Sequence, residues 1–154
     1  FLASYFDQQF NSSMVCVKKG NKPGFLAADP ALGTWLMAPR DAAAVRTIQD
    51  GRWKLEPHPV DWVILPELDR PIGVRRDSVS GVTAIAMARP EDCFTIATPN
   101  QLETHYSLYL SLFGRDLKGG EEARARTRLV VAVSPKDAEI LEAYEAFLKD
   151  VQGP

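Results

Sequence analysis

Alternation of apolar and polar positions near the end of the chain gives its clearest structural signal. The run from Thr104 to Val133 reads as two long strands around a Gly-rich connection, Gly114 to Glu122. Side chains on a strand alternate between two faces, so Arg124, Arg126 and Arg128 share one face of the second strand. The pattern therefore predicts a strand pair that carries three guanidinium groups on one surface.

The rest of the chain predicts further short strands separated by turn-forming residues. Residues 72–76 and 82–88 are expected to form a hairpin across a polar turn. Prolines bracket residues 60–65, and a strand there ends where proline cannot donate to the ladder. The remaining predicted strands are 14–19, 34–37 and 93–98.

Two helices are predicted, one short and one at the end of the chain. Residues 39–50 combine helix-favouring alanines with an acid in the first turn. Near the C-terminus, Ser134, Pro135 and Asp137 fit the N-cap, N1 and N3 positions of a helix. Apolar residues then recur at helical spacing, at 140, 141, 144, 148 and 151. The expected fold class is β-rich α+β, with a mainly antiparallel sheet or sandwich.

Composition narrows the class of protein without naming a reaction. The 154 residues fit a single domain spanning 1–154, and 45% hydrophobic with 25% charged residues is a globular composition. A net charge of -2 argues against nucleic acid as a partner. No apolar run reaches the roughly 20 residues that a membrane span needs. No nucleotide-binding glycine motif, nucleophile motif or metal-ligand spacing occurs, so neither a cofactor nor a metal is expected.

Two features bear on the compartment and leave it open. Cys16 and Cys93 lie in apolar, strand-like surroundings, which favours two buried reduced thiols over a disulfide. The chain begins with Phe1 rather than Met, which fits a removed leader, a trimmed chain or a fragment of a longer protein. A cytoplasmic protein and one secreted after loss of a leader both remain open.

The two histidines are the candidates for proton transfer near neutral pH. His58 lies between two prolines close to Trp62, where it either faces a ligand between aromatic platforms or packs against the core. His105 follows Glu103 by two residues, so both side chains would project to one side of an extended segment. That pair is either a general base with its orienting acid or a hydrogen-bonded beginning of a strand.

The arginine face has two interpretations. Arg124, Arg126 and Arg128 either form solvated pairs with nearby acids, or they build a wall for an anionic or hydroxyl-rich ligand. Tyr109 and Ser111, on the preceding strand, are expected beside them in one of the two registers of the strand pair. The candidate ligand-binding residues are therefore Arg124, Arg126, Arg128, Trp62, His58 and Tyr109.

The C-terminal part of the chain resembles the closing strands of galactose-mutarotase-like domains. Leu117-Lys118-Gly119-Gly120-Glu121 is similar to the L-x-x-G-E segment that precedes the last long strand of that family. The resemblance implies that EDCFTIATP matches the strand that carries the catalytic glutamate in aldose epimerases, where this chain has Ala97. Family domains are about twice as long, so the resemblance implies the C-terminal part of a larger domain. It also implies a carbohydrate-facing sheet with Arg124, Arg126, His105 and Trp62 as contacts.

Three functional hypotheses follow from these observations. The first is a mutarotase-like domain that binds a carbohydrate or sugar acid as a small-molecule ligand without catalysis. The second is an assembly module that forms a homodimer through exposed strand edges. The third is a sugar epimerase-like enzyme that uses His105 with Glu103.

Overall fold

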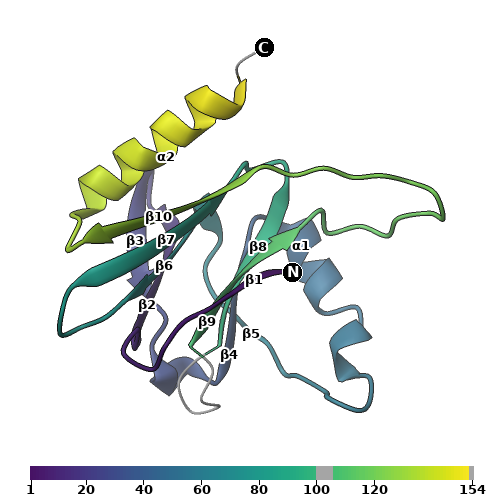
Figure 1. The fold of residues 1–154 in the computed structure, drawn as a ribbon. Helices are drawn as coiled ribbons and strands as arrows, with labels where there is room; N and C mark the ends of the chain where they lie inside the picture. The colour runs from purple at the N-terminus through teal and green to yellow at the C-terminus, as the bar shows by residue number, and fades with distance from the viewer. Residues whose placement is uncertain (100–105, 153–154) are drawn as a thin grey trace.

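Ten strands form two five-stranded sheets that pack face to face in a computed structural model describing residues 1–99 and 106–152 (Figure 1). Neighbouring strands run antiparallel except for β4 and β5, which are parallel. Sheet 1 has the order β1 (Leu2–Tyr5), β9 (Ser107–Leu112), β8 (Cys93–Pro99), β4 (Trp35–Pro39), β5 (Val63–Ile64). Sheet 2 has the order β10 (Thr127–Val133), β7 (Val82–Ala88), β6 (Leu68–Arg76), β2 (Ser12–Lys19), β3 (Lys22–Ala27). The β-rich α+β class predicted from the sequence is confirmed.

The core between the sheets is built from small and large side chains of both sheets. Sheet 2 contributes Ala86 and Ala88, and sheet 1 contributes Ile96, Leu108 and Leu110, all of them buried. A Cβ at Gly73 of β6 would lie 2.6 Å from the side chain of Leu108. The absence of a side chain at residue 73 therefore allows the sheets to approach closely, which gives the dense packing of a protein interior.

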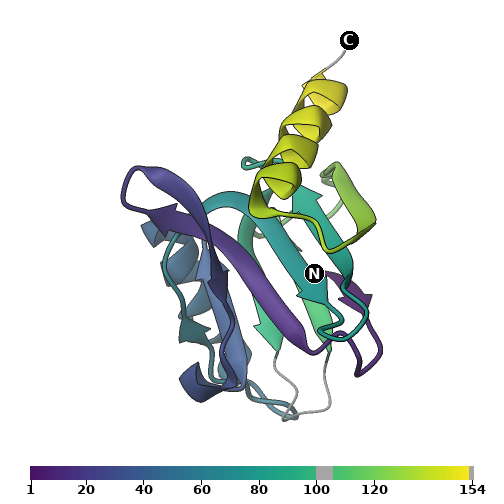
Figure 2. The same cartoon turned by 90° about the vertical axis from the view of Figure 1, so that its left-hand side faces the viewer.

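Each sheet is also covered on its outer face. Helix α2 (Asp137–Gln152) lies across sheet 2, where Ile140, Tyr144 and Phe147 bury themselves against β2, β6 and β7 (Figure 1). Helix α1 (Ala42–Ile48) lies on the opposite side of the molecule, against sheet 1 (Figure 2). Two further single turns are the 3₁₀ segments η1 (Pro30–Leu32) and η2 (Arg52–Lys54). The central strands are therefore buried on both faces, which explains their nearly continuous apolar sequence.

Both predicted helices exist, with different first residues. Asp41 is the N-cap of α1, where its side chain accepts a hydrogen bond of 2.8 Å from the Ala44 N–H, so Pro39 belongs to β4 instead. In α2 the Lys136 N–H donates to the carboxylate of Glu139 at 2.7 Å. The cap therefore lies two residues after the predicted Ser134, whose positive φ of 46° forms the turn before the helix. Local hydrogen bonding decided both boundaries.

The predicted pairing of the last two strands is wrong. Strand β9 belongs to sheet 1, between β1 and β8, whereas β10 pairs with β7 in sheet 2. The Gly-rich segment between them therefore crosses from one sheet to the other. Strand β10 also begins at Thr127, three residues after the predicted Arg124. Within residues 60–65, only Val63–Ile64 forms a strand. The predicted hairpin of β6 and β7 is confirmed.

A buried arginine joins the two sheets at one end. Arg75 of β6 is 2% exposed and donates hydrogen bonds to the backbone carbonyls of Ser107, at 2.9 and 3.2 Å, and of Pro99. Burial lowers the pKa of its guanidinium to about 10, because the charged form loses its hydration. The carbonyl dipoles of sheet 1 offset part of that cost. Arg75 is thus a polar link inside an otherwise apolar layer.

The two thiols occupy different layers and are both free and buried, as the sequence predicted. Cys16 packs in the layer under α2, and Cys93 packs in the core between the sheets. Among the residues that the structure describes, no helix combines the length and the apolar character that crossing a bilayer requires.

Candidate functional site

An aromatic cluster covers the outer face of sheet 1, where α1 leaves the sheet exposed. The Trp53 ring, from η2, lies 5.5 Å from the Trp62 ring and 5.0 Å from the Phe1 ring, measured between centroids. Phe1 also stacks on Tyr109 of β9 at 5.2 Å. Their apolar base is formed by Met37, Ala97 and Ile48. Three separate stretches of sequence thus supply one surface of rings.

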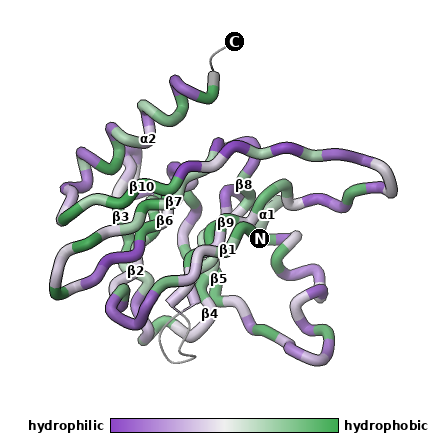
Figure 3. Tube along the Cα trace, in the orientation of Figure 1, coloured by the Kyte–Doolittle hydropathy of each residue, from purple (hydrophilic) through white to green (hydrophobic). Residues whose placement is uncertain are grey.

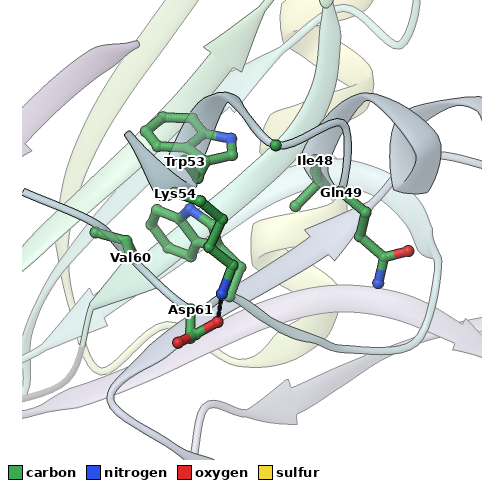
Figure 4. Close-up of a pocket in the computed structure, with 8 residues that line it drawn as sticks. Ile48, Gln49, Trp53, Lys54, Val60 and Asp61 are labelled. Atoms are coloured by element: carbon green, nitrogen blue, oxygen red, sulfur yellow. Dashed lines mark ion pairs between the residues drawn. The ribbon is translucent and has the colours of Figure 1, made fainter. Parts of the chain in front are cut away.

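Trp53 separates two pockets in this surface, here called the smaller and the larger pocket. The smaller pocket, of about 190 Å³, is lined by Trp53, Trp62, Val60, Gln49, Lys54 and Asp61, among others (Figure 4). An ion pair between Lys54 and Asp61 lies at its rim (Figure 4). Because both charges of that pair are exposed to solvent, the rim is polar while the wall is aromatic.

The larger pocket, of about 270 Å³, lies on the other side of Trp53. Phe1, Trp53 and Phe94 form its aromatic walls, and Arg52 and Arg115 supply two cations. Gly114 makes the close approach to Phe94 feasible, because a Cβ there would lie 2.6 Å from the ring. Its φ of 61° also lies in the left-handed region that favours glycine.

Each cation of the larger pocket is held by acids beside it. Arg52 pairs with Asp50 at 2.6 Å and with Asp116 at 3.7 Å, while Arg115 pairs with Glu121. The Asp50 carboxylate accepts hydrogen bonds from Arg52, which lowers the pKa of Asp50 and raises the pKa of Arg52. The pKa of Glu121 is lowered mainly by the hydrogen bond from the Lys118 N–H and, to a smaller extent, by the hydrogen bond from Arg115. Both arginine side chains remain about half exposed, so they are accessible to an anion.

Each pocket also contains one buried polar atom without a hydrogen-bond partner among the described residues. In the larger pocket this is the hydroxyl of Ser111, which is 1% exposed on β9. In the smaller pocket it is the indole Nε1 of Trp62. Buried polar groups are nearly always paired, so each of these atoms has an unused hydrogen-bonding capacity in a residue that lines a pocket.

The three arginines predicted to share one surface have different partners in the structure. Arg124 precedes β10, is exposed, and pairs with Glu122 at 3.3 Å. Arg126 donates to the backbone carbonyl of Val151 at 3.1 Å, and Arg128 pairs with Asp150 at 2.8 Å. The Arg128 guanidinium also lies 5.3 Å from the centre of the Phe147 ring. Two of the three arginines therefore hold the last turn of α2, where cations interact favourably with the helix dipole.

Of the other predicted site residues, some belong to the aromatic surface and some lie elsewhere. Trp62 and Tyr109 both belong to the aromatic cluster of sheet 1. His58 is exposed in the loop between η2 and β5, and it does not line either pocket. Glu103 and His105 lie outside the described residues. Ala97 is buried beneath the aromatic rings.

Sequence reasoning named Ser111 as a neighbour of the arginine surface but missed its grouping with Arg52 and Arg115. The three residues come from β9, from η2 and from the segment after β9, so no fixed spacing connects all three. The signal that was present is Ser111 at two residues from Tyr109, which places both side chains on the same face of the strand.

Comparison of the chain with protein family models, with curated proteins and with solved structures found no match. Within residues 1–99 and 106–152, no three His, Cys, Asp or Glu side chains are grouped so that they could hold a metal ion. The two pockets of the aromatic surface offer aromatic rings, guanidinium and ammonium groups, carboxylates, the Trp62 indole and the Ser111 hydroxyl.

Proposed function

We propose that this protein binds a monosaccharide-sized sugar acid in the larger pocket of sheet 1. The single observation that carries the proposal is the buried Ser111 hydroxyl without a partner, set between aromatic walls and two arginines. The ligand class is the one predicted from the sequence, while the site differs from the predicted arginine surface.

Each part of such a ligand has a counterpart in the pocket. The apolar face of a sugar ring is suited to lie against Trp53 and Phe94. A carboxylate is suited to bidentate hydrogen bonds from Arg115, with Arg52 as a second positive charge beside it. The ring hydroxyls would bond Ser111 and the neighbouring carboxylates. A volume of about 270 Å³ lies near the lower limit for ligand pockets, which favours one sugar ring over an oligosaccharide.

The proposal covers binding and not catalysis. A carboxylate at residue 97 would be needed to match the family's base, and the chain has alanine there. The resemblance to galactose-mutarotase-like domains and an acid–base role for His105 with Glu103 both stay predictions. Binding at the larger pocket requires neither of them.

Calorimetric titration with glucuronate and with glucose tests the proposal. We expect glucuronate to bind at least tenfold more tightly, because its carboxylate gains a charge-assisted hydrogen bond of about 1.5–3 kcal/mol. Arg115→Gln should remove most of this preference, and Ser111→Ala should weaken both sugars. Arg124→Gln is the matched control and should change neither affinity, because that arginine pairs with Glu122 instead.

Two results would contradict the proposal. One is no binding of either sugar by the folded protein. The other is a loss of glucuronate affinity in Arg124→Gln with none in Arg115→Gln, which would place the ligand at the arginine surface predicted from the sequence.

A further inference from the structure

Strand β10 forms an edge of sheet 2 that is apolar and uncovered. In the described residues, β7 is the only strand paired with it. Leu129, Val131 and Val133 are exposed by 54%, 65% and 71%. Figure 3 shows β10 as a hydrophobic stretch at the margin of its sheet. Five consecutive residues, 129–133, carry no charge.

The three exposed side chains continue the inner face of sheet 2. Leu129 lies opposite Ala86 and Val131 opposite Ala84. Ala86 belongs to the core between the sheets, and the buried Ala84, two residues away on β7, shares its face by strand alternation. Leu129 and Val131 therefore point to that same face, beyond the area that sheet 1 covers. The apolar core of the sandwich thus reaches the surface along β10.

The other three sheet edges are protected in ways that natural proteins commonly use. Strand β3 contains Lys22 and Pro23, and Lys19 donates to the Phe25 carbonyl at 2.8 Å. Strands β5 and β1 have only two and four residues. Lysine, proline and shortness all discourage pairing with another chain. Strand β10, with seven residues, has none of these features between Leu129 and Val133.

From this contrast we infer that β10 pairs antiparallel with β10 of a second copy of this chain, joining two copies of sheet 2 into one continuous sheet. Among the strands of the described residues, β10 alone has an unprotected edge, so a second β10 offers an edge of equal length. Antiparallel pairing of identical strands closes as a two-fold dimer. Pairing centred on Val130 uses all seven residues. It places Arg128, the one charged residue of the strand, opposite Ala132 of the partner.

Charge at the two ends of the strand agrees with this orientation. The exposed Arg124 and Arg126 precede β10, whereas Asp137 and Glu139 follow it in the first turn of α2. Antiparallel pairing brings the beginning of one strand next to the end of the other. The arginines of one copy then approach the acids of the partner, and Lys136 beside those acids keeps the attraction modest.

Sedimentation of the full chain over a range of concentrations tests the dimer. We expect a species of twice 17.0 kDa, and Val131→Lys should raise its dissociation constant at least tenfold. The control is Val79→Lys, the same change at a residue that is 93% exposed in the β6–β7 turn, and it should leave the dimer intact. A monomer at every concentration would overturn the inference, and so would a dimer insensitive to Val131→Lys.

Cross-linking tests the register directly. Cα atoms opposite each other across antiparallel strands lie about 4.5–5.5 Å apart, within reach of a disulfide, so Val130→Cys should cross-link to itself on oxidation. Thr127→Cys should not, because its copies would be about 20 Å apart along the strands. The native thiols are buried and should stay silent. Cross-linking at residue 127 but not at 130 would refute this pairing.

Discussion

A single glycine fixes the shape of the larger pocket. Gly114 has a φ of 61°, and a Cβ at this residue would lie 2.6 Å from the Phe94 ring. We expect Gly114→Ala to lower the free energy of unfolding by about 1–3 kcal/mol, because it adds both backbone strain and a steric clash. Chemical denaturation of the two proteins measures the difference.

Gly119 provides the matched control for this substitution. No atom lies within 4 Å of a Cβ added there, and its φ is not in the left-handed region. Gly119→Ala should therefore change stability by less than about 0.5 kcal/mol. Equal effects of the two substitutions would show that neither strain nor contact with Phe94 matters at residue 114.

At the residue scale, the sequence indicated which types of side chain form the aromatic surface, but it did not predict the contact partners of the arginines. Trp62 and Tyr109 were predicted to contact a ligand, which stays a prediction, and both belong to the aromatic cluster of sheet 1. Arg126 and Arg128 were interpreted by strand alternation alone. Their actual partners are Val151 and Asp150 of a helix, and a spacing rule for strands contains no information about that helix.

At the element scale, strand β2 shows how coverage on both faces changes a pattern. Val15, Cys16 and Val17 are consecutive and all buried, because the core lies on one side and α2 on the other. The register of β2 against β6 also shifts between Val15 and Val17. A layer of helix over the sheet thus replaces the simple alternation expected of a strand with one face in water.

The strands β9 and β10 show which element-level features remain hidden in a sequence. Each was predicted near its true position, yet their pairing was wrong because a Gly-rich connection suits both a hairpin and a crossing between sheets. Alternation identifies strands from neighbouring residues. Pairing depends on which sheet has a free edge, and that is decided by the whole fold.

The thiols of β2 and β8 predict how stability depends on pH. Burial raises the pKa of Cys16 to about 11 and that of Cys93 to about 12, from an ordinary value of 9.0. Below pH 9 both thiols are protonated in either state, so their contribution to stability is fully present. As the pH rises above 9, the unfolded thiols ionise first, and stability should fall by about 1.4 kcal/mol per pH unit for each thiol.

Urea denaturation between pH 8 and pH 10.5 measures this loss. Cys93→Ala should remove about half of the thiol-dependent slope, whatever it does to stability at pH 8. An unchanged slope in that variant would mean that the thiol at residue 93 ionises equally easily in the folded and unfolded protein.

At the scale of the whole molecule, the two outer faces serve different purposes. On sheet 2 the helix α2 covers the apolar face, and Arg126 and Arg128 hold its last turn. On sheet 1 the cover is incomplete, because α1 has only seven residues and aromatic side chains form the rest. The proposed ligand site lies on the part of sheet 1 that α1 does not cover and that aromatic side chains cover instead.

The fold class could be predicted because each helix and strand has a recognisable pattern in its own stretch of sequence. Residues adjacent in the sequence are enough to identify strand-forming runs, turns and one long amphipathic helix. The site could not be assembled in the same way. Arg52, Ser111 and Arg115 meet only after sheet 1 brings β9 beside β8 and the α1–η2 segment folds over that sheet.

Chemical-shift mapping of a glucuronate titration on ¹⁵N-labelled protein tests the proposed sugar-acid site directly. We predict saturable shifts of the Trp53 indole N–H and of the backbone amides of Ser111, Gly114 and Arg115. The amides of Arg124 and Arg128 should stay in place. Shifts confined to those two residues, or no saturable shift at Trp53 and Ser111, would contradict a sugar-acid site on the aromatic face of sheet 1.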